Sequence, residues 1–303
     1  MNNVICYGEA LIDFTQEGNS FIPHPGGSPY NVAIALGRLG SSVGFCSQLS
    51  LDLFGKQLLQ YLTDNQVSVE NIVLSSAPST LAFVSTPEHS EPEYAFYSNG
   101  AADVLISEDS KIPSPHAAIH HFGSISLMQE PCGTFWTKYL MQLQGFISFD
   151  PNIRASLIPD PKAYLNRFHK IVNHIDLLRL SLVDLKWLAP TMSKEEFAKE
   201  MIASGVKIVA ITAGDDGAWV YTENYSLHHP AFDIHVEDTI GAGDTFTAGF
   251  LSVLEKKISR NISSDKKILT EALRVGCVAA ALNCKNKGAN PPTKVEIEKE
   301  LID

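Results

Sequence analysis

The sequence predicts an α/β fold in which helices flank a mostly parallel central sheet, with a small group of strands outside that sheet forming a lid. Three observations predict it. Short β-branched or aromatic runs that end at Gly, Ser, Asp or Pro recur along the chain. Segments of helical period, with start and stop signals, lie between them. Two further segments alternate with a period of two. We expect residues 1–303 to form one domain of this kind.

The strand-like runs come first in this prediction because they define the sheet. Strands that alternate with helices favour parallel pairing, with helices on both faces. Six runs have the composition of buried strands: 4–14, 43–49, 119–127, 146–150, 177–182 and 207–212.

Helix start and stop signals separate these runs. Ser28 is placed to cap a helix with Pro29 in its first turn, and Gly40 is placed to end it. Gly205 is a further stop signal. Two pairs match the capping box, in which a Ser or Thr and a Glu three residues later satisfy each other's backbone amides. These pairs are Ser193 with Glu196 and Thr293 with Glu296.

The two segments of period two are residues 15–25 and 80–99. Apolar side chains alternate with polar ones in the second segment, as at Leu81 and Phe83 and again at Tyr94 and Phe96. We expect both segments to lie outside the main sheet and to form the lid, as insertions into one domain.

Composition excludes several classes of protein. With 45% hydrophobic and 19% charged residues, the chain can bury a large core. A net charge of −11 disfavours nucleic acid or an anionic membrane as partner, although a local pocket for a small anion stays open. No apolar stretch approaches the roughly 20 residues of a membrane span, and the N-terminus lacks the features of a leader. The five cysteines form no C-x-x-C pair, so we expect reduced, buried thiols in a cytoplasmic protein.

The sharpest motif is the segment 238–246, Asp-Thr-Ile-Gly-Ala-Gly-Asp-Thr-Phe. A Gly241-Ala242-Gly243 turn that leads into a helix directs unpaired backbone N–H groups toward one point and forms an anion hole. An acid inside such a hole suits a general base, which would take a proton from a hydroxyl as its oxygen attacks phosphorus. Alternatively, Asp244 is an acid that the helix dipole favours in the first turn, and the glycines are needed only for a tight turn. Phe246 stands where a dinucleotide fingerprint has its third glycine.

A second motif begins at Gly26-Gly27 and contains Asn31. Paired glycines before a helix allow the backbone to approach a ligand closely, and Asn31 offers a donor and an acceptor to a polyol. A glycine-rich loop whose Asn satisfies local backbone groups is the structural alternative.

Together, segments 26–40 and 238–244 resemble the two signatures of the ribokinase-like (PfkB) carbohydrate kinases. Their order and the gap of about 200 residues between them also match, and the similarity covers essentially the whole chain. The resemblance implies a Rossmann-like central sheet with a small β lid. It also implies transfer of the γ-phosphoryl group of ATP to a sugar hydroxyl.

Site residues follow from this resemblance position by position. Asp244 resembles the catalytic base, and the backbone of Gly241, Ala242 and Gly243 resembles the anion hole. Asp13, with Gly26, Gly27 and Asn31, is in the position of the sugar-binding residues. The segment 150–154, Asp-Pro-Asn-Ile-Arg, is similar to the family's D-x-N-x-R strand end, which makes Arg154 a candidate for a substrate or phosphate contact. A turn-capping Asp13 and a surface ion pair at Arg154 are the alternatives.

The nucleotide site is implied in the same way. Thr212, Gly214 and Gly217 match the family's T-x-G-x-x-G loop, although the isolated hexapeptide also suits a simple turn. The segment 287–289 resembles the loop that closes over adenine. In many members that loop helps to hold a monovalent cation such as K⁺, for which Asp238 and Gly288 are the candidates here.

Three positions depart from the family pattern. The N-x-x-E motif, associated with Mg²⁺ and its water shell, appears as Ser181 to Asp184, and Asp is one methylene shorter than Glu. We therefore expect Asp184 to act on Mg²⁺ indirectly. Cys277 lies where several members have an Asn near the adenine. Ser98 lies where fructokinase-like members commonly have an Arg, which puts the accepted sugar in doubt.

The resulting hypothesis is an ATP-dependent sugar kinase that uses Mg²⁺, with K⁺ open as a second cation. Fructose is the first choice of sugar because segments 121–127 and 150–154 are most like fructokinase-type members. Ribokinase, 2-keto-3-deoxygluconate kinase and nucleoside kinase stay open as alternatives. So does a sugar- or nucleotide-binding protein without catalysis, which the complete 241–244 motif argues against and the altered Ser181–Asp184 motif favours. A homodimer formed through the lid is also open.

Overall fold

A nine-stranded sheet forms the centre of the protein, which we describe from a computed structural model covering residues 2–85, 93–257 and 262–302. The strand order is β13-β12-β11-β10-β9-β8-β1-β4-β5. Neighbouring strands run parallel except at β12 and β13, which pair antiparallel at one edge. The bounds are β1 Val4–Tyr7, β4 Val43–Ser50, β5 Ser68–Ser75, β8 Ile119–Gly123, β9 Phe146–Asp150, β10 Leu177–Ser181, β11 Ile208–Thr212, β12 Ala218–Tyr221 and β13 Ser226–His229.

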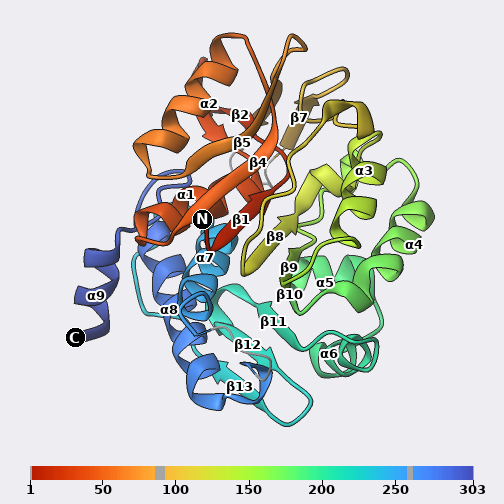
Figure 1. Ribbon diagram of the computed structural model, residues 1–303. Helices are drawn as coiled ribbons and strands as arrows, with labels where there is room; N and C mark the ends of the chain where they lie inside the picture. The colour runs from red at the N-terminus through yellow and green to blue at the C-terminus, as the bar shows by residue number, and fades with distance from the viewer. Residues whose placement is uncertain (1, 86–92, 258–261, 303) are drawn as a thin grey trace.

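Helices cover both faces of this sheet (Figure 1). The larger apolar core lies on the face of α1, α7 and α8, and the second core lies on the opposite face, under α3, α4 and α6. The helix bounds are α1 Ser28–Arg38, α2 Leu53–Asp64, α3 Cys132–Leu140, α4 Pro161–Ile171, α5 Leu182–Leu188, α6 Lys194–Ala203, α7 Ala242–Leu254, α8 Lys266–Cys284 and α9 Lys294–Ile302.

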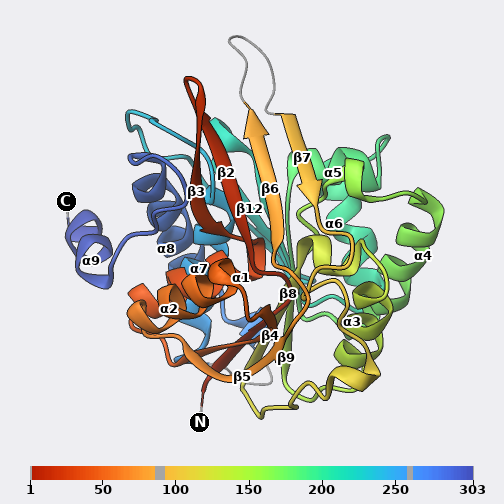
Figure 2. The ribbon, with the colours of Figure 1, turned by 90° about the horizontal axis from the view of Figure 1, so that it is seen from above.

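A second sheet of four strands, in the order β3-β2-β6-β7, stands apart from the central one (Figure 2). Its strands are β2 Leu11–Glu17, β3 Ser20–Gly26, β6 Thr80–Ser85 and β7 Glu93–Tyr97. The pair β2–β6 is parallel and the other two pairs are antiparallel. The predicted strands outside the main sheet are therefore present. Residues 86–92 of the predicted segment 80–99 lie outside the described residues.

Two predicted strands were too long. The run 4–14 is split at Gly8 into β1 of the central sheet and β2 of the small sheet. Gly8 has a φ of +141°, and a Cβ added there would lie 2.7 Å from Ser126 Oγ. The run 119–127 ends as a strand at Gly123 and continues as a 3₁₀ turn over Ser124–Leu127. Apolar composition alone did not reveal these breaks, because the residues on both sides of each are buried.

The predicted helix start at Ser28 was wrong by one residue. Gly27 occupies the N-cap with a φ of 108°, and Ser28 is already in the helix. Its hydroxyl is used elsewhere, as described below. Both predicted capping boxes are confirmed. In the first, Ser193 Oγ accepts a hydrogen bond from the Glu196 N–H. In the second, the Thr293 N–H donates to the Glu296 side chain.

All five cysteines are buried, as expected, and each is a free thiol within the described part of the chain. In that same part, no helix combines the length and apolar character needed to cross a membrane.

Candidate active site

The candidate site is centred on the first turn of α7. Gly241 is the N-cap residue, with a left-handed φ of 74°, and a Cβ there would lie 2.7 Å from the Cβ of Ala289. The first N–H groups of a helix have no partner within the helix, so this turn can bind an anion. Of the three predicted amides, that of Ala242 already donates to Thr239 O at 3.2 Å. The amides of Gly241 and Gly243 therefore remain the leading candidate donors.

Asp244 lies in this turn, and its carboxylate is 7% exposed. Ser28 Oγ donates to Oδ1 at 2.7 Å and Asn31 Nδ2 donates to Oδ2 at 2.9 Å. Burial raises the pKa of Asp244, while these two donors and the charges of Arg179 and Arg154 oppose the rise. The carboxylate is thus held in one orientation by α1 and has a raised proton affinity, both of which a general base requires.

Asp13 is close enough to interact with the same carboxylate. It lies half-buried on β2, and burial raises its pKa to about 7; the charge of Arg154 lowers this pKa and that of Asp244 raises it. A Cβ on Gly26 would overlap Asp13 Oδ2, so the glycine is required beside this acid. Asp13 and Gly26, from the two strands of the β2–β3 hairpin at its open end, and Asn31 from α1 thus lie near Asp244.

Glu9 secures the glycine loop and was missed by the sequence analysis. Its carboxylate is 2% exposed and accepts hydrogen bonds from the N–H groups of Ser28 and Ser126, both at 3.1 Å. Burial raises the pKa of Glu9 to about 7, and the nearby charge of Asp103 adds to the rise. The available signal was an acid directly after Gly8, at the end of an apolar run and shortly before Asp13.

Arg154 lies in the loop after β9. Its Nη1 donates to Asn152 Oδ1 at 2.7 Å and to Ile153 O at 3.1 Å. Its charge also acts on Asp13 and Asp244. The structure therefore brings Arg154 to the acids of the candidate site and gives it interactions with its own loop as well.

The predicted nucleotide loop follows β11. Thr212 is the last residue of β11, and Gly214 and Gly217 have φ values of +54° and +86°. Ala213 N–H donates to Gly217 O at 2.8 Å, which closes the turn. Both glycines thus have a backbone reason for their presence, and a nucleotide role stays a prediction.

Cys277 lies on α8 within the larger core and is 7% exposed. A nucleotide contact at this position also stays a prediction.

Asp238 joins two loops of the candidate site. Its Oδ1 accepts from the Ile240 N–H at 3.0 Å and its Oδ2 accepts from the Gly288 N–H at 2.8 Å. Gly288 has a φ of +66°. The carboxylate therefore ties the loop of residues 287–289 to the turn before α7, with oxygen lone pairs left that a hard cation can use.

The carboxylate of Asp184 accepts more hydrogen bonds from the protein than that of Asp238 does. Its Oδ1 accepts from the Ile153 N–H at 2.7 Å, and its Oδ2 accepts from Ser181 N and Oγ at 2.9 and 2.6 Å. Among the described residues, no group of three or more His, Cys, Asp or Glu side chains is placed to hold a metal ion. Both carboxylate oxygens of Asp184 therefore already accept hydrogen bonds from the protein.

A buried ion pair between Arg179 and Asp150 was also missed by the sequence analysis. Arg179 on β10 donates from Nη1 to Asp150 Oδ2 at 2.7 Å and from Nη2 to Thr212 Oγ1 at 2.7 Å. Asp150 ends β9 and is fully buried, which raises its pKa to about 6. An Arg within the otherwise apolar run of residues 177–180 was the signal in the sequence.

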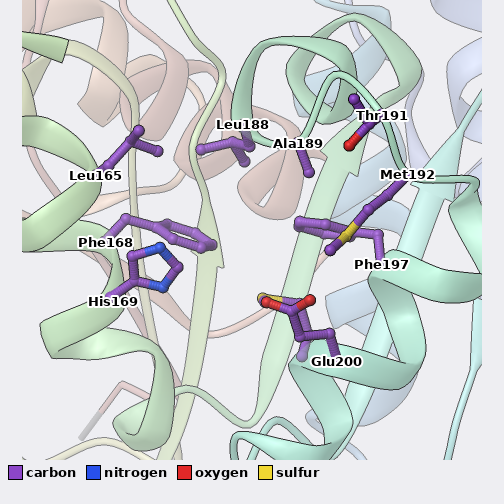
Figure 3. Close-up of a pocket in the computed structure, with 10 residues that line it drawn as sticks. Leu165, Phe168, His169, Leu188, Ala189, Thr191, Met192, Phe197 and Glu200 are labelled. Carbon is purple, nitrogen blue, oxygen red and sulfur yellow. The ribbon is translucent and has the colours of Figure 1, made fainter. Parts of the chain in front are cut away.

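A cavity of about 190 Å³ lies elsewhere, among α4, α5 and α6 (Figure 3). Most of its lining residues are apolar, and the polar ones are His169, Thr191 and Glu200. It shares no lining residue with the predicted site, so it does not extend the candidate active site.

Comparison with known proteins places this geometry among kinases. Residues 1–296 match the family described as "pfkB family carbohydrate kinase". The chain is 33% identical to Fructokinase-1 of Zea mays over 311 residues, covering 97% of this chain and 96% of the maize protein. The crystal structure of a fructokinase with bound ATP from Xylella fastidiosa is similar with a TM-score of 0.91 and 26% identity, over 100% of both chains. That of a fructokinase from Vibrio cholerae O395 with fructose, ADP and a calcium ion has a TM-score of 0.89 and 27% identity, over 99% of this chain and 98% of the other.

Proposed function

The chain belongs to the pfkB family of carbohydrate kinases, and on that premise we propose that it is an ATP-dependent fructokinase. The observation that carries this proposal is the buried Asp244 carboxylate, held by Ser28 and Asn31 in the first turn of α7. Fructokinases of known structure with ATP, or with fructose and ADP, share the whole fold. Fructose is therefore the acceptor that the similarities favour.

In the proposed reaction, Asp244 takes the proton from a hydroxyl of fructose. That oxygen forms a bond to the γ-phosphorus of ATP, the bond from this phosphorus to the β–γ bridging oxygen breaks, and ADP leaves. The N–H groups in the first turn of α7 stabilise the charge on the transferred phosphoryl oxygens. Asp244 is well suited to accept the proton because burial raises its pKa while two hydrogen bonds fix its position.

We assign sugar binding to Asp13, Asn31, Arg154 and the backbone at Gly26 and Gly27. Asp13 and Asn31 lie on opposite sides of the glycine pair in the sequence, and both are tied to the surroundings of Asp244. Carboxylate and amide groups pair well with sugar hydroxyls. The small sheet that includes β2 is the proposed lid, which excludes water from the reaction when it closes.

The nucleotide is assigned to Thr212, Gly214, Gly217, Ser181 and Cys277, with the amide of Gly243 toward its phosphates. Mg²⁺ would neutralise charge on the phosphates of ATP; because Asp184 is already occupied, we propose that it reaches the ion only through water. We place a K⁺ site at Asp238 and Gly288, whose hydrogen bond joins the two loops. The five cysteines without a C-x-x-C pair favour a cytoplasmic location.

A homodimer through the lid is part of the proposal. Phe21, Ile22 and Tyr97 are exposed on the small sheet, by 42%, 37% and 65%. Phe83 lies on the inner strand β6, and its ring stacks on that of Phe14 with the two centroids 4.8 Å apart. The apolar surface therefore belongs to the two outer strands, β3 and β7, which are the edges that a second copy could pair with.

A coupled ADP-release assay tests the activity directly. Wild-type protein with ATP, Mg²⁺ and K⁺ is offered fructose, ribose, 2-keto-3-deoxygluconate, tagatose and adenosine, and replacing K⁺ by Na⁺ tests the cation site. We expect the highest kcat/KM with fructose. A clear preference for another acceptor would reassign the substrate, and binding of ATP and sugar without turnover would favour the non-catalytic alternative.

A further inference from the structure

Arg179 is a charged side chain inside the central sheet. It lies on β10 between β9 and β11, is 5% exposed, and has apolar neighbours in sequence on both sides. Side chains alternate between the faces of a strand. Because Leu177 belongs to the core on the α7 side and Leu178 to the other core, Arg179 points toward α7.

The guanidinium joins two segments of the candidate site. Nη1 donates to Asp150, in the strand end that leads to Arg154, and Nη2 donates to Thr212, in the strand end that leads to the nucleotide loop. Both bonds measure 2.7 Å, which is short and favourable for a charged donor. One side chain thus holds both strand ends at once.

The same guanidinium lies directly behind the phosphate-binding turn. A Cβ added to Gly243 would lie 2.8 Å from both Nη1 and Nη2, so the backbone of Gly243 is in contact with the charged group. The ring of Phe246, one turn further along α7, lies with its centroid 5.7 Å from Cζ. Gly243 is therefore required by the Arg beneath it as well as by any ligand above it.

A purely structural ion pair explains this arrangement less well. Burying an ion pair costs desolvation energy that its attraction barely repays, and apolar residues of similar volume often serve stability equally well. The group is also incompletely satisfied, because Nε has no hydrogen-bond partner in the described part of the chain. What apolar residues cannot supply is a permanent positive charge at the first turn of α7.

We propose that Arg179 is a positioning residue for phosphoryl transfer, which fixes the first turn of α7 against Asp150 and Thr212 and places a positive charge behind Gly243. This inference rests on the proposed kinase function. Backbone amides that stabilise a developing charge are effective when they are held in place before the reaction. Arg179 supplies both the attachment and additional positive potential.

The charge has a second consequence, for Asp244. The charged groups that interact with that carboxylate are Asp13 from β2, Arg154 from the loop after β9, Arg179 from β10 and Asp150 at the end of β9. Arg179 lowers the pKa of Asp244 against the effect of burial. Loss of Arg179 must therefore raise this pKa, whereas loss of the negative charge of Asp150 must lower it.

The test compares R179M, R179K and D150N in the full-length protein, with circular dichroism and melting temperature as checks of folding. We expect R179M to lower kcat about 30-fold or more. In the plot of kcat/KM against pH, R179M should shift the acid limb to higher pH by at least about half a unit, whereas D150N should shift it to lower pH. R179K keeps the positive charge, so its acid limb should lie close to the pH of the wild-type limb.

Lys207 offers a matched control. It forms a 2.6 Å ion pair with Asp176 at the opposite ends of the same two strands, β10 and β11. K207M should leave kcat and the acid limb unchanged. A folded R179M with the wild-type kcat and acid limb would overturn the proposal, as would shifts of equal sign in R179M and D150N. If R179M does not fold, D150N decides: an acid limb that does not move to lower pH in folded D150N would overturn the proposal.

The proposed function can fail separately. If the wild-type protein turns over no acceptor of the panel, the activity is wrong whatever Arg179 does. The role of Arg179 is then judged by calorimetry with ATP, where we expect R179M, or R179K if R179M does not fold, to bind at least about fivefold more weakly than K207M. Equal affinity would overturn the proposal.

Discussion

Changing Glu9 to Gln isolates one buried carboxylate that holds the glycine loop. Glu9 accepts from the Ser28 and Ser126 amides, and burial raises its pKa from the ordinary value of 4.5 to about 7. Below pH 4.5 the side chain is protonated in the folded and unfolded states alike. Between pH 4.5 and about 7 the unfolded chain releases the proton while the folded protein keeps it. The stability of the folded state therefore falls as pH rises through this window.

The size of the effect follows from the change in pKa. At about 1.4 kcal/mol for each pH unit, ionisation of Glu9 costs the folded protein about 3 kcal/mol above pH 7, of which about 2 to 3 kcal/mol develops between pH 5 and pH 8. Gln cannot ionise, so E9Q escapes this cost. It loses a hydrogen bond because its amide nitrogen faces an N–H donor, but that loss is the same at both pH values.

The assay is urea unfolding of both proteins at pH 5 and pH 8, followed by tryptophan fluorescence, to which the buried Trp136 contributes. The stability of E9Q relative to wild type should improve by about 2 to 3 kcal/mol from pH 5 to pH 8. Buried acids that do not interact with Glu9, such as Asp150, cancel because both proteins contain them. E108Q is the control: this exposed carboxyl has a pKa lowered by Lys138, so the relative change should be small and of opposite sign. A relative gain for E9Q below about 1 kcal/mol would refute the reasoning.

Three further predictions concern activity and assembly. D244N should reduce kcat at least about 100-fold while ATP still binds, because the proton acceptor is lost; near-normal turnover would remove Asp244 from its role. R154A should raise KM for fructose more than it lowers kcat, since its charge acts on Asp13; unchanged kinetics would return Arg154 to a role within its own loop. Light scattering at micromolar concentration should show a dimer that Y97E disrupts, given the exposed ring on β7, and a wild-type monomer would contradict pairing through the lid.

The sequence predicted the architecture well where a local pattern and the final environment agree. Buried parallel strands read as short apolar runs, and the capping boxes at Ser193 and Thr293 are local hydrogen-bond patterns that persist in the folded chain. The break at Gly8 and the helix start at Gly27 depend on contacts with Ser126 and Glu9, which lie far apart in sequence. No local pattern encodes such contacts.

The candidate site divides in the same way. Asp244, Asp13 and Asn31 lie in recognisable motifs, and the structure brings their surroundings together. Glu9 and Arg179 act through partners on other elements, so their importance is visible only once the strands are aligned. Ser28 shows the opposite error, because a good capping residue was taken for a cap when its hydroxyl serves Asp244 instead.

Strand β2 begins beside the acids of the site and runs outward into the small sheet, so one continuous segment carries both Asp13 and the body of the proposed lid. A rigid displacement of that sheet must move Asp13 together with it, pivoting near Gly8 where the chain leaves the central sheet. The empty enzyme would then lack a complete acceptor pocket, and sugar binding would itself assemble it. Transfer of the phosphoryl group to water would then be disfavoured in two ways. Without sugar the acceptor pocket is incomplete, and with sugar bound the closed lid excludes water.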